Sequence, residues 1–329
     1  MLYPIKFRPR VKERIWGGHA IAAMKAGSGA RLSPDKLYGE SWGALLGQRR
    51  RVGGGQRISE RQRSERDRRG IHGRSGRRED IRKVRNRISA AGQISRLQRR
   101  IIGAGAPRRH SGRRAARLCG QNRDVVCGRL QSPARHCTSA SRIPEITREE
   151  YIEAVAKSTL PELLNRIEVS PGDIFFIPAG VVHALGAGIE VIEIQQTSDI
   201  TYRIYDWDRV DASGRPRELH TALAVDAIDF SADARELHKH YRSSGGAGAA
   251  EVISCDYFNV SVVEVASELE RDRMGIDSFT VYVCIDGTAE ITSEGGSERI
   301  ARGEAILIPA EADSVKINGC CRLLEVYVK

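Results

Sequence analysis

Residues 43–144 contain no Phe, Tyr or Trp, although the whole chain has 3 Trp, 9 Tyr and 6 Phe among 329 residues. Aromatic side chains supply much of the apolar area that a folded core buries, so a segment of this length without any is not expected to build a core. The segment also shows no sustained helical or strand periodicity. We therefore expect residues 43–144 to be disordered.

The same segment differs from the rest of the chain in charge. It holds 28 Lys plus Arg, 27 of them Arg, against 6 Asp plus Glu, a net charge of +22. The other 227 residues hold 25 basic and 36 acidic groups, so the net charge of +11 for the whole chain averages two different compositions.

Two interpretations of this Arg-rich segment are open. It could be a basic arm that binds nucleic acid through the phosphates, but it has no interleaved aromatic residues and no RGG-type repeat to support base stacking. Alternatively, it is an out-of-frame translation of a GC-rich gene, because GC-rich codons encode Arg, Gly, Ala and Ser. The second interpretation is favoured, and nucleic acid is not the expected partner.

Several features indicate the cytoplasm as the compartment. No run of 18 apolar residues is present, so no membrane-spanning helix is expected. Met1 to Arg10 shows neither the apolar stretch nor the cleavage site of a secretory signal. The seven cysteines are an odd number and include the adjacent Cys320 and Cys321, which does not indicate a disulfide framework.

Outside the Arg-rich segment the sequence predicts short strands with a few helices. Thr147 and Glu150 form a capping box that opens a helix through about Lys157. Further helices are expected after Pro161 and over Arg217–Ile228, and a linker over 243–250. The expected strands are Ile174–Ile177, Ile189–Ile194, Thr201–Trp207, Phe258–Val265, Phe279–Ile285, Thr288–Ile291, Ala305–Ile308 and Leu323–Val328. This pattern predicts small β-barrels or sandwiches.

An internal repeat indicates two related barrels. The sequence GDIFFIPAG at 172–180 aligns with GEAILIPAE at 303–311, and only the first copy is followed by a histidine, His183. Glycines and a proline make a sharp corner between strands, after which His183 could point into the barrel and hold a metal. A histidine with a purely structural hydrogen bond is the alternative.

The spacing of Gly172, Pro178, Gly180 and His183 resembles the second signature of the cupin barrels. Four stretches together are similar to type I mannose-6-phosphate isomerases of the short bacterial form: KERIWGG at 12–18, GESW at 39–42, PAGVVHALG at 178–186 and EIQQTSDITYRIYDW at 193–207.

The resemblance covers 1–42 and 145–329 and implies a mainly β cupin double barrel of jelly-roll type with a few short helices. In this fold, residues 1–42 would form the N-terminal part of the catalytic cupin and residues 145–242 its remainder. Residues 43–144 would be the aberrant Arg-rich segment, and residues 243–329 would form a second, metal-free barrel.

The resemblance also implies a zinc-dependent isomerase that interconverts mannose 6-phosphate and fructose 6-phosphate through a cis-enediol, with one Zn²⁺ per catalytic domain. His183 matches the family's metal-binding histidine. Arg203 matches its active-site arginine, which stabilises anionic charge, and Glu193 resembles an active-site glutamate that transfers the proton or orients Arg203. The alternatives are a salt bridge from Arg203 to Asp199 or Asp206 and a solvated Glu193 on a strand.

Two other classes of protein are compatible with parts of the sequence. A different cupin enzyme, such as an oxygenase, is not supported, because the run from 193 to 207 resembles the sugar isomerases. A non-catalytic partial cupin with a basic nucleic-acid-binding insertion remains the alternative.

In the resembled family, the other metal ligands are a Gln-x-His pair and a Glu, which would fall inside 43–144. They are absent there as protein but can be recovered from codons: Gly103–Arg109, started one base later, can encode Val-Gln-Val-His-Pro-Asp, and Gly120–Cys127 can encode Gly-Lys-Thr-Glu-Met-Trp-Tyr-Val. Frame slips are expected near Trp42, between Cys127 and Gln131, and near Pro144.

The histidines inside the Arg-rich segment do not replace these ligands, because none lies in a matching motif; they are His72, His110 and His136. We therefore expect the gene to encode an isomerase, and the chain as written to be inactive or misfolded.

Overall fold

The structure is a computed structural model. It describes residues 3–7, 10–18, 38–43, 90–96, 101–104, 123–130, 136–139, 146–185, 189–196, 202–207, 209–210, 213–231, 238–243 and 245–328.

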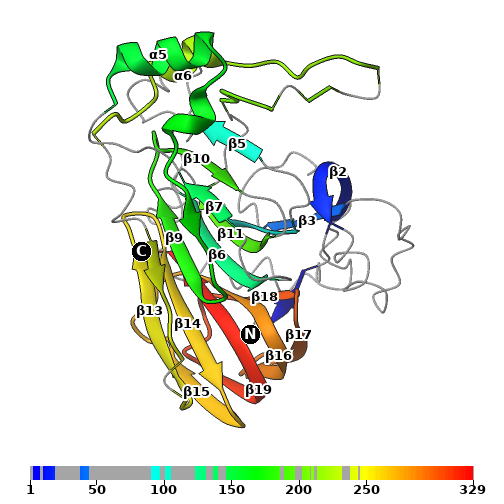
Figure 1. The fold of residues 1–329 in the computed structure, drawn as a ribbon. Helices are drawn as coiled ribbons and strands as arrows, with labels where there is room; N and C mark the ends of the chain where they lie inside the picture. The colour runs from blue at the N-terminus through cyan, green and yellow to red at the C-terminus, as the bar shows by residue number, and fades with distance from the viewer. Residues whose placement is uncertain are drawn as a thin grey trace, which may run out of the picture. The chain divides into compact units, whose positions relative to one another are not determined.

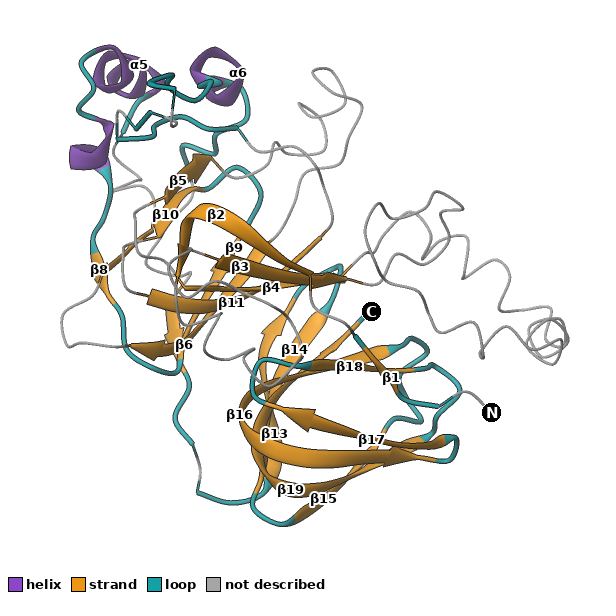
Figure 2. Cartoon of the chain, turned by 90° about the vertical axis from the view of Figure 1, so that its right-hand side faces the viewer, coloured by secondary structure: helices purple, strands orange, loops and turns teal. Residues whose placement is uncertain are grey.

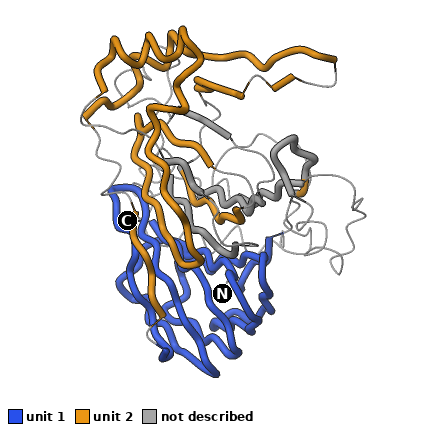
Figure 3. The backbone as a smooth tube through the Cα atoms, viewed as in Figure 1, with its two compact units in different colours: residues 1–10, 42–90, 245–329 blue, residues 11–41, 91–244 orange. Residues whose placement is uncertain are grey.

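The chain divides into two compact units, which Figure 3 shows in different colours. Unit 1 comprises residues 1–10, 42–90 and 245–329, and unit 2 comprises residues 11–41 and 91–244. Strands dominate the described part of the chain, and helices are few and short (Figure 2). The expected mainly β fold with a few short helices is confirmed.

The C-terminal residues build one eight-stranded antiparallel sheet (Figure 1). Its order is β1-β18-β16-β19-β14-β13, with β15 paired to β19 and β17 paired to β16. The strands are β1 (Ile5–Lys6), β13 (Gly248–Ser254), β14 (Asn259–Val265), β15 (Glu268–Asp272), β16 (Thr280–Ser293), β17 (Gly296–Ala301), β18 (Ala305–Ile308) and β19 (Ser314–Tyr327).

Strand β16 joins two segments that the sequence analysis separated. The register shifts between Cys284 and Asp286, and Gly287 follows with a φ of +78°. A Cβ at Gly287 would collide with the carbonyl oxygen of Cys320, so only glycine fits this irregularity. The expected turn at Gly287 is therefore a kink within one long strand.

Strand β1 corrects part of the expected domain division. Ile5 and Lys6 pair with Leu307 and Ile306 of β18, so the first residues of the chain complete the C-terminal sheet and do not belong to the first barrel. Lys6 also forms an ion pair with Glu304 at 2.7 Å. Sequence patterns could not show this, because a pairing across some 300 residues leaves no local signal. The linker expected over 243–250 likewise ends early, since β13 begins at Gly248.

A buried carboxylate lies among the strands of unit 1. Glu325 on β19 is 1% exposed and accepts hydrogen bonds from the Tyr282 hydroxyl at 2.7 Å and from Arg271 Nη2 at 2.7 Å. Burial raises the pKa of Tyr282 well above its usual value, and the charge of Glu325 raises it further. Glu325 therefore ties two strands other than its own, β16 and β15, to the core.

Replacing this carboxylate should destabilise unit 1. In Glu325→Ala the buried Tyr282 hydroxyl and Arg271 lose their partner, which is expected to cost about 3–5 kcal/mol of local stability. The control Glu268→Ala breaks an exposed ion pair with Lys316 and should cost about 1 kcal/mol or less. Hydrogen exchange of peptides from β15, β16 and β19, followed by mass spectrometry, measures both. Equal protection in the two variants would contradict this role for Glu325.

The remaining strands form two further sheets. A seven-stranded sheet has the order β12-β9-β6-β11-β4-β3-β2, and a four-stranded sheet has the order β5-β10-β7-β8. The strands are β2 (Arg10–Gly18), β3 (Tyr38–Gly43), β4 (Ala90–Arg96), β5 (Ile101–Ala104), β6 (Arg123–Leu130), β7 (His136–Ser139), β8 (Ile167–Glu168), β9 (Asp173–Ile177), β10 (Val182–Leu185), β11 (Ile189–Gln196) and β12 (His238–His240).

Four of these strands, β4 to β7, fall inside the Arg-rich segment 43–144. They pair with strands that the sequence analysis did expect: β6 lies between β9 and β11, and β10 lies between β5 and β7. The expectation of disorder does not extend to these four strands, and the rest of the segment lies outside the described residues. Backbone pairing with a neighbouring strand needs no hydrophobic pattern, which is why periodicity did not reveal them.

The described residues include three helical segments: α5 (Arg148–Ala156), the 3₁₀ helix η2 (Leu160–Leu163) and α6 (Thr221–Val225). The capping box of α5 is confirmed, since Thr147 accepts from the Glu150 amide at 3.2 Å and the Glu150 carboxylate accepts from the Thr147 amide at 2.7 Å. In the described part of the chain no helix combines the length and apolar character that crossing a membrane requires.

Two expected elements around the third helix are wrong. The helix expected over 217–228 is only α6, and the expected strand over 201–207 is irregular in its described part. The reason is mutual bonding: the Arg203 amide donates to His220 Nδ1 at 3.1 Å, and the His220 amide donates to the Arg203 carbonyl at 2.7 Å. These contacts use backbone groups that a strand or a longer helix would need.

Candidate functional site

The corner that precedes His183 has the geometry expected from its sequence. Gly172 begins it with a φ of +98°, and Gly180 ends it with a φ of +94°, both in the left-handed region that favours glycine. A Cβ on Gly180 would lie 3.0 Å from the carbonyl oxygen of Ala227. The Val181 amide donates to the Pro178 carbonyl at 3.2 Å, which closes the turn into β10.

His183 is buried on β10, with 7% of its surface exposed. Its Nδ1 lies 3.1 Å from the Val181 carbonyl oxygen, a contact that holds the ring in one orientation. Its register partners are Gly103 on β5 and Ser139 on β7. A carbonyl contact of this kind serves a structural histidine and a metal ligand equally, so the metal role of His183 stays a prediction.

The described residues around His183 do not fit a zinc site. Catalytic zinc is normally held by three protein ligands of the His, Cys, Asp or Glu type. Among the described residues, no group of three or more such side chains could hold a metal ion. His183 alone supplies one donor, and its partners in β5 and β7 are a glycine and a serine.

Glu193 lies on the core side of the seven-stranded sheet. It is half-buried on β11 and opposite Val125 of β6, which in turn lies opposite the buried Phe175 of β9. Alternation along β11 places Glu193 on the same face as the buried Val191. This position does not favour the alternative of a solvated strand residue, and the catalytic role of Glu193 stays a prediction.

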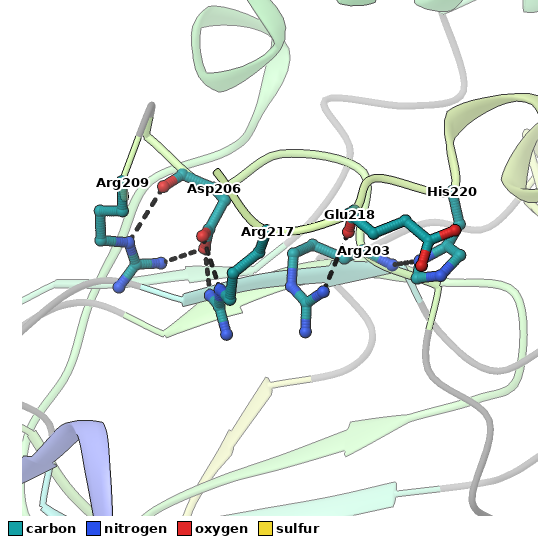
Figure 4. Close-up of polar contacts among 6 residues, drawn as sticks. All are labelled: Arg203, Asp206, Arg209, Arg217, Glu218 and His220. Atoms are coloured by element: carbon teal, nitrogen blue, oxygen red, sulfur yellow. Dashed lines mark hydrogen bonds and ion pairs between the residues drawn. The ribbon is translucent and has the colours of Figure 1, made fainter. Parts of the chain in front are cut away.

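Arg203 lies in the irregular stretch after β11. Its Nη1 donates to the Glu218 carbonyl at 3.0 Å, so its guanidinium is held by a backbone oxygen (Figure 4). Burial lowers the pKa of Arg203, and repulsion from Arg217 lowers it further. The alternative of a salt bridge to Asp206 is not what the structure shows, because Asp206 binds two other arginines; Asp199 lies outside the described residues.

Asp206 is a buried carboxylate that sequence reasoning named only as a possible partner of Arg203. Arg209 Nη2 binds its Oδ1 at 2.6 Å, and Arg217 binds both of its oxygens, with Nε at 2.7 Å from Oδ2. Burial by itself would raise the pKa of Asp206, but hydrogen bonds and charge from Arg217 and Arg209 hold that pKa below its usual value. The sequence signal was present as an Asp with three further arginines within 14 residues of Arg203, at positions 209, 215 and 217.

Asp173 on β9 is also a buried carboxylate. Its Oδ1 lies 2.6 Å from His240 Nδ1 and 3.2 Å from His238 Nε2, and its Oδ2 accepts from the Ser170 amide at 2.6 Å. Burial would raise the pKa of Asp173, but these contacts keep it below its usual value. Asp173 therefore fixes strand β12 against β9, as the pairing of His240 with Asp173 also shows.

A cavity of about 470 Å³ lies beside α5 and η2. Its lining includes Glu150, Glu153, Lys157 and Leu163 and none of the predicted site residues. The predicted site therefore does not coincide with this cavity. That His183, Glu193 and Arg203 face one common cavity stays a prediction.

The C-terminal part of the chain matches a known protein family. Residues 250–328 match the family model described as mannose-6-phosphate isomerase, cupin domain. Among curated proteins, the chain is 32% identical over 173 residues to mannose-6-phosphate isomerase ManA of Bacillus subtilis, a match that covers 53% of this chain and 54% of that protein. It is 28% identical over 173 residues to mannose-6-phosphate isomerase of Streptococcus mutans, with the same coverage.

Solved structures show the same fold over nearly the whole chain. The mannose 6-phosphate isomerase of Bacillus subtilis superposes with a TM-score of 0.71 at 23% identity, covering 99% of this chain and all of that one. A mannose 6-phosphate isomerase bound with zinc and yttrium superposes with a TM-score of 0.68 at 17% identity, covering 99% of each chain.

The resemblance expected from the sequence is confirmed. The fold is that of the cupin-type mannose-6-phosphate isomerases, and the sequence similarity is to the same proteins. The chain spans about half the length of the curated relatives it matches.

Proposed function

We propose that the gene of this chain encodes a zinc-dependent aldose–ketose isomerase that interconverts mannose 6-phosphate and fructose 6-phosphate through a cis-enediol. We further propose that the chain as written carries only part of that site. The curated relatives named above are mannose-6-phosphate isomerases, and one structural neighbour is described as bound with zinc, which supports the reaction and the metal.

The observation that carries the proposal is the environment of Arg203. The Arg203 side chain is half-buried, and its guanidinium donates to a carbonyl oxygen and lies beside Arg217 (Figure 4). A cation in such a setting gains more from an anionic ligand than a solvated surface arginine would. A sugar phosphate and the enediolate formed from it are both anions, so this chemistry fits the proposed reaction.

Arg203 and Glu193 would have different roles in the reaction. Arg203 stabilises negative charge on the substrate, and Glu193 moves the proton between the two sugar carbons or orients Arg203. Its carboxylate is half-buried on the core side of the sheet, where water competes less for the proton. His183 alone does not complete a zinc site, so no step of the reaction is assigned to the metal in this chain.

An assay of the frame-corrected protein tests the proposal. The gene is sequenced, any frame slips are corrected, and mannose 6-phosphate is offered with Zn²⁺ in an assay coupled to the removal of fructose 6-phosphate. We expect turnover, with mannose 1-phosphate inactive as a control for the position of the phosphate. If the nucleotide sequence supports the written frame throughout, or if the corrected protein turns over neither hexose 6-phosphate, the proposal is wrong.

A further inference from the structure

Two arginines of unit 2 bind the buried carboxylate of Asp206, and a third arginine, Arg203, lies beside one of them (Figure 4). Asp206 is 6% exposed and pairs with Arg209 and Arg217, and Arg203 interacts electrostatically with all three. Three guanidinium groups against the carboxylates of Asp206 and Glu218 leave one net positive charge. Because like charges repel, such a group is stabilised when an anion of matching charge binds to it.

The guanidinium groups of Arg203 and Arg217 lie next to each other and project in the same direction in Figure 4. Arg217 is turned by Asp206, which binds its Nε and Nη2 through both carboxylate oxygens. The Arg217 side chain is still 26% exposed, so its outer nitrogen side can reach a ligand. A planar guanidinium held along one edge presents its other donors in a fixed geometry.

The turn that supplies Asp206 is itself held in an uncommon conformation. Trp207 has a φ of +50°, which is rare for a residue other than glycine and costs free energy. The guanidinium carbon of Arg209 lies 5.4 Å from the centre of the Trp207 ring, and Arg209 Nε donates to the Asp206 carbonyl at 3.0 Å. These contacts fix the backbone from which the Asp206 carboxylate points at Arg217.

We propose that Arg217 joins Arg203 in binding the dianionic phosphate group of the sugar phosphate, and that Asp206 is a positioning residue that orients Arg217 for this contact. The proposal rests on the proposed function for the identity of the ligand. A phosphomonoester carries a charge of roughly −1.5 to −2 near neutral pH, opposite in sign to the net charge of the cluster. Paired guanidinium groups also match the spacing of phosphate oxygens.

A simple structural ion pair is the competing explanation for Arg217. One arginine would satisfy Asp206 for that purpose, whereas the structure commits two arginines to it and places a third alongside. Burial and repulsion from Arg217 both lower the pKa of Arg203. Repulsion between Arg203 and Arg217 is unfavourable in an arrangement that only stabilises the fold. In an anion-binding site, the bound anion relieves this repulsion.

Binding of inorganic phosphate and of mannose 6-phosphate, measured by isothermal titration calorimetry, tests the role of Arg217 without any turnover. The full chain as written and the frame-corrected protein are both used, with circular dichroism to verify folding. Arg217→Gln should weaken the binding of both probes about tenfold or more, since one charge-assisted bidentate contact is lost. Arg215→Gln removes the same charge from an exposed residue two positions away and should change binding about twofold at most.

Two further variants separate positioning from charge. Asp206→Asn makes the cluster more positive, so a purely electrostatic role predicts tighter phosphate binding, whereas a positioning role predicts binding weakened about tenfold. Arg217→Lys keeps the charge but loses the two-point contact with Asp206, and it should fall between the parent and Arg217→Gln. Because Arg217→Lys retains the charge, it serves as the second test if Asp206→Asn does not fold.

The outcomes are distinct. Binding that depends on Arg217 and weakens in Asp206→Asn supports the proposal. Unchanged binding in Arg217→Gln, or no phosphate binding by either folded parent, overturns it. Equal or tighter binding in Asp206→Asn overturns the positioning role. If phosphate binds through Arg217 but the frame-corrected protein does not isomerise mannose 6-phosphate, the anion site stands and the proposed function fails.

Discussion

The chain as written is expected to retain far less than one zinc ion and to show negligible mannose 6-phosphate isomerase activity, whatever the zinc concentration. The reason is the number of ligands. His183 supplies one donor, no cluster of three candidate ligands occurs among the residues that the structure describes, and catalytic zinc normally needs three. Elemental analysis of the purified protein, beside a coupled isomerase assay, gives both quantities.

Correcting the reading frame should restore both zinc and activity. Three single-base corrections are expected, near Trp42, between Cys127 and Gln131, and near Pro144. Position 104, which would become Gln, lies on β5 opposite Val182, and position 123, which would become Glu, lies on β6 between Ile177 and Gln195. Full activity of the uncorrected chain would show that this account of the site is wrong.

In the corrected protein, His183→Ala and Arg203→Ala should separate metal binding from substrate chemistry. His183→Ala should lose bound zinc and turnover together, because a ligand is removed. Arg203→Ala should keep its zinc and lose about 10²- to 10³-fold in kcat, the usual cost of removing one group that stabilises charge in the transition state.

A matched control uses an exposed arginine of the same unit. Arg242→Ala should keep both zinc and rate, since Arg242 is exposed and outside the arginine cluster. Zinc per chain and kcat are measured on each variant after its folding has been verified by circular dichroism. If Arg203→Ala lost its zinc as completely as His183→Ala, the assignment of Arg203 to the substrate would be refuted.

Local signals in the sequence predicted the elements that are stabilised locally. The capping box at Thr147 and the glycine-bounded corner from Gly172 to Gly180 were correct, because both depend on contacts between residues a few positions apart. The helix over 217–228 was overestimated for the opposite reason. His220 bonds to Arg203, 17 residues earlier in the chain, and this contact replaces helical bonding.

The residues of the candidate site could be predicted from the sequence, but their contacts could not. His183, Glu193 and Arg203 could be named from their motifs, and the structure places Glu193 on the core side of its sheet and Arg203 beside Arg217. The arginines that pair with Asp206 could not be predicted, because Arg203, Arg209 and Arg217 are all close to it in the sequence. The choice depends on how the turn at Trp207 directs the carboxylate, which is a property of the folded backbone.

The sequence by itself determined the mainly β fold, the internal sequence repeat and the abnormal composition of 43–144, because hydrophobic spacing, turn residues and charge are properties of individual positions in the sequence. Only the tertiary structure decided that β1 completes the C-terminal sheet, that strands within 43–144 pair with β9, β10 and β11, and that Arg209 and Arg217 pair with Asp206. Each of these depends on contacts between segments far apart in the chain, whose free energy is gained only after the intervening loop has closed.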